Sequence, residues 1–194
     1  MRSAFAIGVS NLIRPSRFSA PIVIALVALT GLIPNAAPAQ TEPARVPNGA
    51  KFGAWTVQCQ APAVGESQCF LQQDLRRAED QAFVATLVAF WGTGEEPAPS
   101  MMIARVPNGA FLPAGFGLKP NEESAPVSFV WQQCGRDLCE AAAAIPRETM
   151  QTLAQSDGVI GGFRPQRGAQ DLLFQVDMTG LVAGMDALNP DASE

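Results

Sequence analysis

Apolar and polar side chains alternate along most of this chain in short runs, the period of half-buried β-strands. The clearest run lies within Val127 to Ile145, where Val127, Phe129 and Trp131 alternate with Ser128 and Gln132 before a Gly135-Arg136-Asp137-Leu138 turn. This run predicts a strand, a tight loop and a second strand, with Cys134 and Cys139 at the two lips of the loop. Further strands are predicted at 52–60, 69–77, 82–91, 101–106, 110–118, 159–163 and 172–178.

Two departures from simple alternation refine this picture. Residues 82–91 are apolar almost throughout, which predicts a central strand covered on both faces. Pro113 and Gly115 interrupt the apolar run 110–118, which is typical of an edge strand or a bulge. Helical spacing is confined to 146–156 and to a terminal turn near 180–188. The pattern therefore predicts an all-β fold with one short helix and a helical C-terminal turn.

The first 39 residues have the pattern of a secretory signal peptide. Arg2, Arg14 and Arg17 form a basic region without acids, and an apolar run follows at 21–33. That run is shorter than the roughly 20 residues of a membrane-spanning helix. Ala37-Pro38-Ala39 then supplies a cleavage site before Gln40. We expect a signal peptide at 1–39, an exported protein located in the periplasm or secreted, and no stable membrane span after cleavage.

Length and composition describe one globular domain in the remaining chain. The protein has 194 residues, of which 47% are hydrophobic and 16% charged, with 17 glycines and 16 prolines that favour many turns. Many short strands at regular spacing are typical of a β-sandwich. We expect a mobile N-terminal lead at 40–50, a β-sandwich domain at 51–188 and a polar tail at 189–194.

The absence of histidine and tyrosine limits the chemistry of the protein. It removes the commonest general base, the commonest metal ligand and every Ser-His or Cys-His arrangement. No phosphate-binding or dinucleotide-binding motif is present, so no cofactor is expected. The predicted leader carries three of the 13 basic residues and none of the 18 acidic ones. The remaining acidic domain lacks a basic stripe, which argues against a nucleic-acid partner.

Carboxylates remain the residues best able to support an enzyme. Glu95-Glu96 and Glu122-Glu123 fall in predicted loops, and Asp171 and Asp177 lie at opposite ends of one predicted strand. Neighbours in sequence rarely face one another across a substrate. A carboxylate-dependent hydrolase of the envelope is therefore an alternative function, recognisable by a cleft with two facing carboxylates.

Cys59, Cys69, Cys134 and Cys139 permit three disulfide pairings. Two hairpins suffice for pairing Cys59 with Cys69 and Cys134 with Cys139, because opposed residues in a hairpin lie within disulfide distance. A zinc site is the alternative, but no C-x-x-C knuckle is present and exported chains meet oxidising conditions. A thiol-active folding factor is a further alternative, which requires an exposed and easily reduced pair.

Two other segments attract attention. The heptapeptide Ala-Arg-Val-Pro-Asn-Gly-Ala occurs at 44–50 and again at 104–110. We interpret it as turn chemistry used twice, because Asn-Gly supplies the positive φ angles of a tight hairpin turn, rather than as a duplicated binding loop. Phe111, Leu112 and Phe116 form a candidate interaction patch if their segment is an exposed edge, and a part of the core if it is a bulged strand.

The order of several short motifs resembles the invasion-associated locus B family of exported bacterial proteins. The likeness covers 51–188 and includes Phe52-Gly53-x-Trp55-x-Val57-x-Cys59, Cys69, Pro107-Asn108-Gly109 followed by Phe111 to Gly115, Cys134 to Cys139, and a closing segment with Gly180 and Ala187-Leu188. The resemblance implies an immunoglobulin-like β-sandwich and a periplasmic or secreted location, and it brings no catalytic residues. Leu181 follows Gly180 where the family has an aromatic residue.

These observations together favour a non-enzymatic interaction protein of the bacterial cell envelope. The expected partner is a protein or another envelope component that the sequence does not name. We expect no catalytic, cofactor-binding or metal-binding residue.

Overall fold

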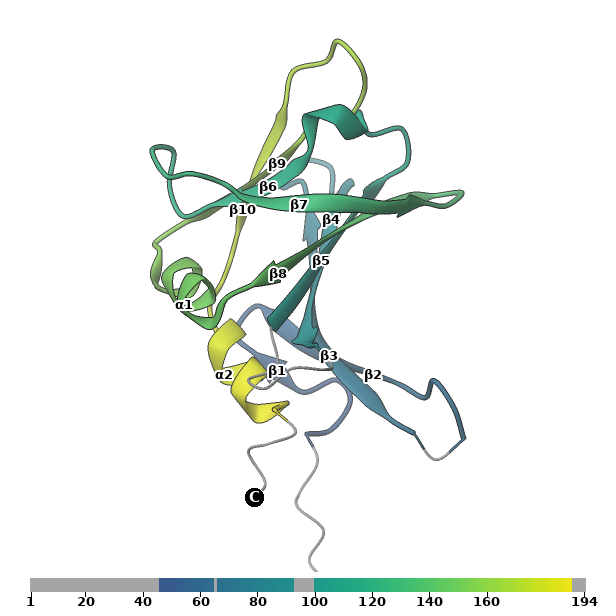
Figure 1. Cartoon of the computed structure of the whole chain (residues 1–194), viewed down its shortest axis with the longest axis vertical. Helices are drawn as coiled ribbons and strands as arrows, with labels where there is room; N and C mark the ends of the chain where they lie inside the picture. The colour runs from purple at the N-terminus through teal and green to yellow at the C-terminus, as the bar shows by residue number, and fades with distance from the viewer. Residues whose placement is uncertain (1–45, 65, 93–99, 190–194) are drawn as a thin grey trace, which may run out of the picture. The chain divides into compact units, whose positions relative to one another are not determined.

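In the computed structural model, the described residues 46–64, 66–92 and 100–189 contain ten strands and two α-helices (Figure 1). The predicted signal peptide lies outside these residues. The strands are β1 (Lys51–Phe52), β2 (Trp55–Gln60), β3 (Gln68–Arg76), β4 (Phe83–Trp91), β5 (Ser100–Pro107), β6 (Phe116–Lys119), β7 (Val127–Cys134), β8 (Leu138–Ile145), β9 (Val159–Phe163) and β10 (Leu172–Val176). The helices are η1, a 3₁₀ turn (Leu112–Ala114), α1 (Arg147–Gln155) and α2 (Leu181–Ala187).

All ten strands belong to one antiparallel sheet in the order β1-β2-β3-β4-β5-β8-β7-β6-β9-β10. Strand β7 joins the two parts of this sheet, and Figure 1 shows it running between the group β6, β9, β10 and the remaining strands. Its first residues, Val127 to Phe129, pair with β6, whereas Val130 to Cys134 pair with β8. A register shift between Trp131 and Gln133 accompanies the change of partner, as expected where a strand passes from one layer to another.

The structure confirms the prediction of an all-β fold with a short helix and a helical C-terminal turn. It also shows how the layers arise. They are the two parts of a single curled sheet, continuous through β7, rather than two separately bonded sheets. The alternation of side chains along each strand indicates which face is buried, but strand order depends on long-range pairing that this local pattern does not contain.

The core lies inside the curled sheet. Strand β4 lies between β3 and β5, and Val84 to Ala89 are all buried, as the apolar run 82–91 predicts. Trp55 and Val57 of β2 are also fully buried. Helix α1 places Met150 and Leu153 in the same core, and α2 adds Leu181, Gly184 and Met185. Within the described residues, no helix is long and apolar enough to cross a membrane.

The beginning and the end of the described domain are in direct contact. Gly53 and Gly180 both have positive φ, of 55° and 86°. A Cβ at Gly53 would overlap the carbonyl of Thr179, and a Cβ at Gly180 would overlap the main chain of Phe52. The amide of Ala54 donates a hydrogen bond to the Thr179 carbonyl over 3.1 Å. Only glycine permits this close approach of β1 and the start of α2.

The predicted strand 110–118 is wrong in its first half. Residues Leu112–Ala114 form the turn η1, which has Pro113 near its start. Only Phe116–Lys119 form a strand. Proline favours the first turn of a helix, and Gly115 has a φ of 78°, so the chain turns before it enters β6.

Candidate functional site

The β7–β8 hairpin carries the disulfide that the alternation at 127–145 predicts. Cys134 and Cys139 are register partners, their Cα atoms lie 3.9 Å apart, and their sulfur atoms are bonded. The amide of Gly135 closes the loop by donating to the Leu138 carbonyl over 2.7 Å. Cys139 is buried with 1% exposure, whereas Cys134 is exposed. Half of this bridge therefore belongs to the core.

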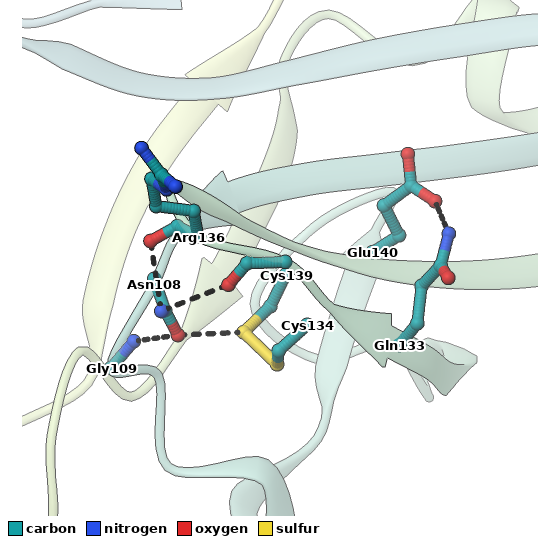
Figure 2. Close-up of a disulfide and its surroundings, with 8 residues drawn as sticks. Asn108, Gly109, Gln133, Cys134, Arg136, Cys139 and Glu140 are labelled. Carbon is teal, nitrogen blue, oxygen red and sulfur yellow. Dashed lines mark hydrogen bonds between the residues drawn. A yellow bond between two sulfur atoms is a disulfide. The ribbon is translucent and has the colours of Figure 1, made fainter.

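Asn108, in the turn after β5, fastens this loop to the sheet (Figure 2). Its Nδ2 donates to the carbonyls of Gly135 and Arg136, each over 3.1 Å. Its Oδ1 accepts from the Gly109 amide over 2.8 Å and lies 3.5 Å from Sγ of Cys139. That last approach is a polar contact, because a disulfide sulfur has no proton to donate. One side chain thus joins the end of β5 to both lips of the bridged loop.

A charged group lies beside the same hairpin. Glu140 accepts hydrogen bonds from Gln133 over 2.8 Å and from Arg105 over 2.7 Å. The Gln133 bond, followed by the bond and the charge of Arg105, lowers the pKa of Glu140, while burial acts in the opposite direction. The carboxylate therefore ties β5, β7 and β8 together in its ionised form.

The other bridge joins Cys59 to Cys69, which are register partners in β2 and β3 with Cα atoms 4.0 Å apart. Both cysteines are half-buried. The Cys59 amide donates to Oδ1 of Asn48 over 3.0 Å. The four cysteines are thus paired as the two-hairpin arrangement predicts, and none is free.

Asn48 and Asn108 are the asparagines of the two heptapeptide copies, so each copy contacts one disulfide hairpin. Turn chemistry is confirmed in part: Gly49 and Gly109 have positive φ, but neither asparagine does. The turn type inferred from Asn-Gly is therefore wrong. The contacts to the cysteines were not predicted, although the repeated heptapeptide was the signal that could have indicated them.

The candidate patch is only partly at the surface. Phe111 is half-buried, with the Arg167 guanidinium 5.5 Å from its ring centroid, and Leu112 is 39% exposed. Phe116 is 2% exposed and meets the Phe129 ring edge-on at 5.0 Å. Its place in the patch is wrong, because alternation along β6 turns Phe116 inward with Leu118.

An open groove of about 440 Å³ lies on the outward face of β6, β7, β9 and β10. Gly117 and Gly162 are register partners in this face. A Cβ at Gly117 would lie 3.3 Å from Cβ of Pro126, and one at Gly162 would lie 2.8 Å from Cδ2 of Leu173. The two glycines therefore leave room for the groove that larger side chains would fill.

The groove is largely apolar and joins the exposed part of the patch. Leu173 is 66% exposed, Ile160 and Pro126 lie beside it, and Ala114 at the end of η1 connects it to Leu112. Lys119 and the ion pair between Arg164 and Asp171, 2.8 Å long, border it with charge. The sequence analysis missed Gly117, Gly162 and Leu173. Outward glycines beside an outward leucine were the available signal.

The carboxylates considered for catalysis are not brought together. Glu95 and Glu96 lie outside the described residues, and Glu122 and Glu123 are exposed in a loop. Asp171 borders the groove, while Asp177 lines a different pocket and accepts from the Thr179 amide over 2.8 Å. Among the residues described, no three metal-ligating side chains are grouped for an ion.

Comparisons with known proteins agree with this fold. The family model described as "Invasion associated locus B (IalB) protein" matches residues 55–189. The crystal structure of invasion associated protein B from Bartonella henselae superposes with a TM-score of 0.60. It is 15% identical, and the match covers 72% of this chain and 92% of that one. A search of the curated proteins finds no significant match.

Proposed function

The chain belongs to the invasion-associated locus B family, and on this premise we propose that it is an exported, non-enzymatic interaction protein that binds a partner protein of the bacterial envelope. The groove between Gly117 and Gly162 carries this proposal. Its flank includes Leu173 at 66% exposure. An apolar groove flanked by exposed apolar side chains is typical of a surface that another protein covers.

A protein surface fits this groove better than a small molecule does. Small-molecule sites usually enclose most of the ligand, whereas the apolar side chains here stand on an open sheet face. The charged border formed by Lys119 and the Arg164–Asp171 pair resembles the polar rim of a protein interface around an apolar centre.

The carboxylate-dependent hydrolase has less support. A polar pocket away from the groove is lined by Asp74, Asp157 and Asp177. Glycoside hydrolysis needs a carboxyl whose pKa is raised so that it can donate a proton at neutral pH. Hydrogen bonds from Thr179 lower the pKa of Asp177 instead. Asp177 therefore does not have the raised pKa that the general acid of such an enzyme requires.

The two disulfides support an oxidising, extracytoplasmic location, and so does the predicted leader. A thiol-active folding factor is less well supported, since Cys139 is buried and Asn108 covers its side of the bridge. Whether the protein stays in the periplasm or is secreted is part of the same proposal. The compartment of the captured partner would distinguish the two locations.

The test is comparative cross-linking and capture from envelope extract with the protein lacking residues 1–39. Leu173→Asp adds a charge in the groove, and Val64→Asp adds the same charge to an apolar residue that is fully exposed in the β2–β3 loop. Both positions are exposed, so each change should alter stability by only about 0.5 kcal/mol. We expect one protein to be captured by the wild type and by Val64→Asp and lost with Leu173→Asp. An identical set of captured proteins for both variants would refute the groove as the binding surface.

A further inference from the structure

The two end strands of the sheet differ in how their outer edges are protected. β1 has only two residues, and Gly180 packs against the main chain of Phe52. β10 pairs on one side with β9 and has no strand on its other side within the described residues. It spans Leu172–Val176, contains no charged residue or proline, and pairs with β9 without a register shift. Natural sheets usually protect an exposed edge with such features, so the edge of β10 is unusual.

The hydrogen bonds around β9 and β10 show which main-chain groups face this edge. The Arg164 carbonyl accepts an amide hydrogen bond from the segment before β6 over 2.8 Å. Main-chain direction alternates along a strand, so the neighbouring Phe163 bonds toward β10, where its register partner is Leu172. The same alternation along β10 turns the N–H and C=O groups of Leu173 and Gln175 away from β9.

The segment after β10 agrees with this alternation. Asp177 is the next outward-facing position after Gln175, and its carbonyl accepts a hydrogen bond from Nε2 of Gln73 over 2.7 Å. The outward groups of Leu173 and Gln175 have no hydrogen-bond partner among the described residues. Two donors and two acceptors of β10 can therefore pair with a further strand.

Space for such a strand lies beside β10. An open pocket of about 370 Å³, which we call the edge slot, is lined by residues 172–175 of β10, by 75–79 and by Val84. Consecutive residues of a strand point to opposite faces, so a pocket that contacts four of them in a row runs along the edge. The groove, in contrast, contacts only Leu173 of this strand. The edge slot and the groove are therefore adjacent but distinct.

The shape of the edge slot favours a single strand as its occupant. Its far wall consists of residues 75–79, at the end of β3 and in the turn before β4. Neighbouring strands lie about 4.8 Å apart, so a second copy of this sheet would bring its own next strand against that wall. An extended segment without a sheet behind it meets no such obstacle.

The side chains of the edge slot indicate the chemistry of that segment. Leu75 and Val84 are apolar. Arg76 has no carboxylate partner among the described residues, whereas Arg77 pairs with Asp80 at 3.6 Å. Resting on the proposed function, which makes the partner a protein, we propose that this partner adds an extended segment to β10 as a further strand. Apolar side chains at alternate positions contact Leu75 and Val84, and an acidic residue pairs with Arg76.

Hydrogen exchange of the protein lacking residues 1–39 tests whether the edge is unpaired. The amides of Phe174 and Val176 bond to β9, so they should exchange at least about tenfold more slowly than those of Leu173 and Gln175. Slow exchange at Leu173 and Gln175 would show that another part of the chain, or a second copy, already covers the edge. That result would overturn the proposal.

The binding probe is an acetylated heptapeptide in which valine and threonine alternate between two terminal glutamates. N-methylation of the valines blocks the N–H groups on one edge of the extended peptide, and N-methylation of the threonines blocks the other edge. We expect NMR shifts at Leu173, Gln175 and 75–79, with a dissociation constant on the order of 1 mM for the parent peptide.

The two methylated peptides carry the same side chains and differ only in the edge that is blocked. One should bind within about twofold of the parent, and the other should bind at least about tenfold more weakly, because it cannot donate to β10. Equal affinities of the two methylated peptides, or no binding of the parent, would refute strand addition.

A variant of the protein tests the same edge from the other side. Gln175→Pro removes one outward N–H group and keeps the bonds to β9, since proline is tolerated on the outer side of an edge strand. Gln175→Thr is the matched control, because it changes the same side chain and keeps the N–H group. Peptide binding should fall at least about tenfold in the proline variant alone. Equal affinities of the two variants, with both melting temperatures retained, would contradict the proposal, and the methylated peptides decide if the proline variant unfolds.

The acidic contact has its own pair of variants. Arg76→Gln should weaken binding of the parent peptide about threefold, as expected for an exposed ion pair. Arg77→Gln should have a smaller effect, because Arg77 already pairs with Asp80. Equal losses in the two variants would overturn the assignment of an acidic residue to the partner.

Capture from envelope extract separates the edge slot from the groove. The partner should be lost with Gln175→Pro and kept with Gln175→Thr. The peptide titration uses the purified protein, so its failure refutes the added strand and leaves the groove unaffected. Capture that is lost with Gln175→Pro but unchanged with Leu173→Asp would refute the groove and support the added strand.

Discussion

The β2–β3 and β7–β8 hairpins are both closed by a disulfide between directly opposed cysteines, yet they occupy different positions in the sheet. β2 lies one strand from the end of the sheet, and Cys59 and Cys69 are both half-buried. β7 and β8 lie in its interior, and Cys139 is 1% exposed. The bridges span 10 and 5 residues of sequence.

Loop length and burial predict opposite rankings for the contributions of the two disulfides to stability. The chain-entropy model gives about 2.8 kcal/mol for the loop closed by Cys59 and Cys69 and about 2.2 kcal/mol for the loop closed by Cys134 and Cys139. Removing a buried sulfur from Cys139 adds a cavity cost of roughly 1–2 kcal/mol, which exceeds the difference in loop entropy. We therefore expect the shorter bridge to contribute more, because the burial of Cys139 outweighs the shorter loop.

The largest effect should come from removing both bridges. With all four cysteines changed to alanine, the free energy of unfolding should fall by about 5–7 kcal/mol, against a total of roughly 5–15 kcal/mol for a domain of this size. The protein should then be marginally folded at 25 °C. Urea unfolding followed by circular dichroism measures this. A variant that keeps the wild-type midpoint would show that neither bridge stabilises the fold.

The next prediction compares the bridges directly. Cys134→Ala with Cys139→Ala should cost about 3–4 kcal/mol, and Cys59→Ala with Cys69→Ala about 2–3 kcal/mol. Both variants should keep a β-rich circular dichroism spectrum. Equal or reversed losses would mean that loop entropy outweighs burial. Peptide mapping under non-reducing conditions should recover Cys59 joined to Cys69 and Cys134 joined to Cys139 in the wild type.

The two asparagines give a finer comparison. Asn108→Ala removes two donated bonds and one accepted bond beside the buried bridge and should cost about 1–2 kcal/mol. Asn48→Ala removes one accepted bond and should cost about 0.5–1 kcal/mol. Denaturant midpoints of the two single variants provide the measurement. A greater loss from Asn48→Ala would contradict the difference inferred for the two hairpins.

The smallest effect concerns acid stability. The pKa of Glu140 is lowered in the folded state, so its contribution is present above the unfolded pKa and is lost as pH falls through the folded pKa. Gln133→Ala removes the hydrogen bond that lowers this pKa most, so acid unfolding should move to slightly higher pH. Gln132→Ala is the matched control, because Gln132 bonds to the Val130 carbonyl and to no carboxylate. The same shift in both variants would exclude Glu140 as the cause.

How well the sequence predicts a contact depends on how far apart along the chain the two contacting residues lie. Each cysteine pair meets across a single hairpin, so alternation and turn residues were sufficient to place them. Phe116 was a candidate for a surface patch because Pro113 and Gly115 interrupt the apolar pattern before it, and the same pattern also allowed a buried, bulged strand. Its burial follows from pairing with Phe129 of β7 and Phe163 of β9, which lie far along the chain.

The groove and the edge slot also depend on distant residues. Gly117 and Gly162 lie side by side at the base of the groove only because β6 pairs with β9. Gln73 and Asp177 meet only because the sheet curls and brings the end of β10 to β3. A local hydrophobic pattern does not contain these pairings, and the repeated asparagines show that even a visible motif reveals its partner only in the folded chain.

The close packing of Gly53 on Thr179 and of Gly180 on Phe52 also bears on the order in which the protein can fold. A chain that emerges from the ribosome or a translocation channel with its N-terminus first presents β1 long before residue 180. The β2–β3 hairpin can pair and oxidise early, and β1 can pair with β2, but the contacts of Gly53 with Thr179 and of Gly180 with Phe52 cannot form until residues 179 and 180 arrive. Completion of the fold must therefore wait for nearly the whole domain, so the N-terminal contacts of the domain are among the last to form during synthesis.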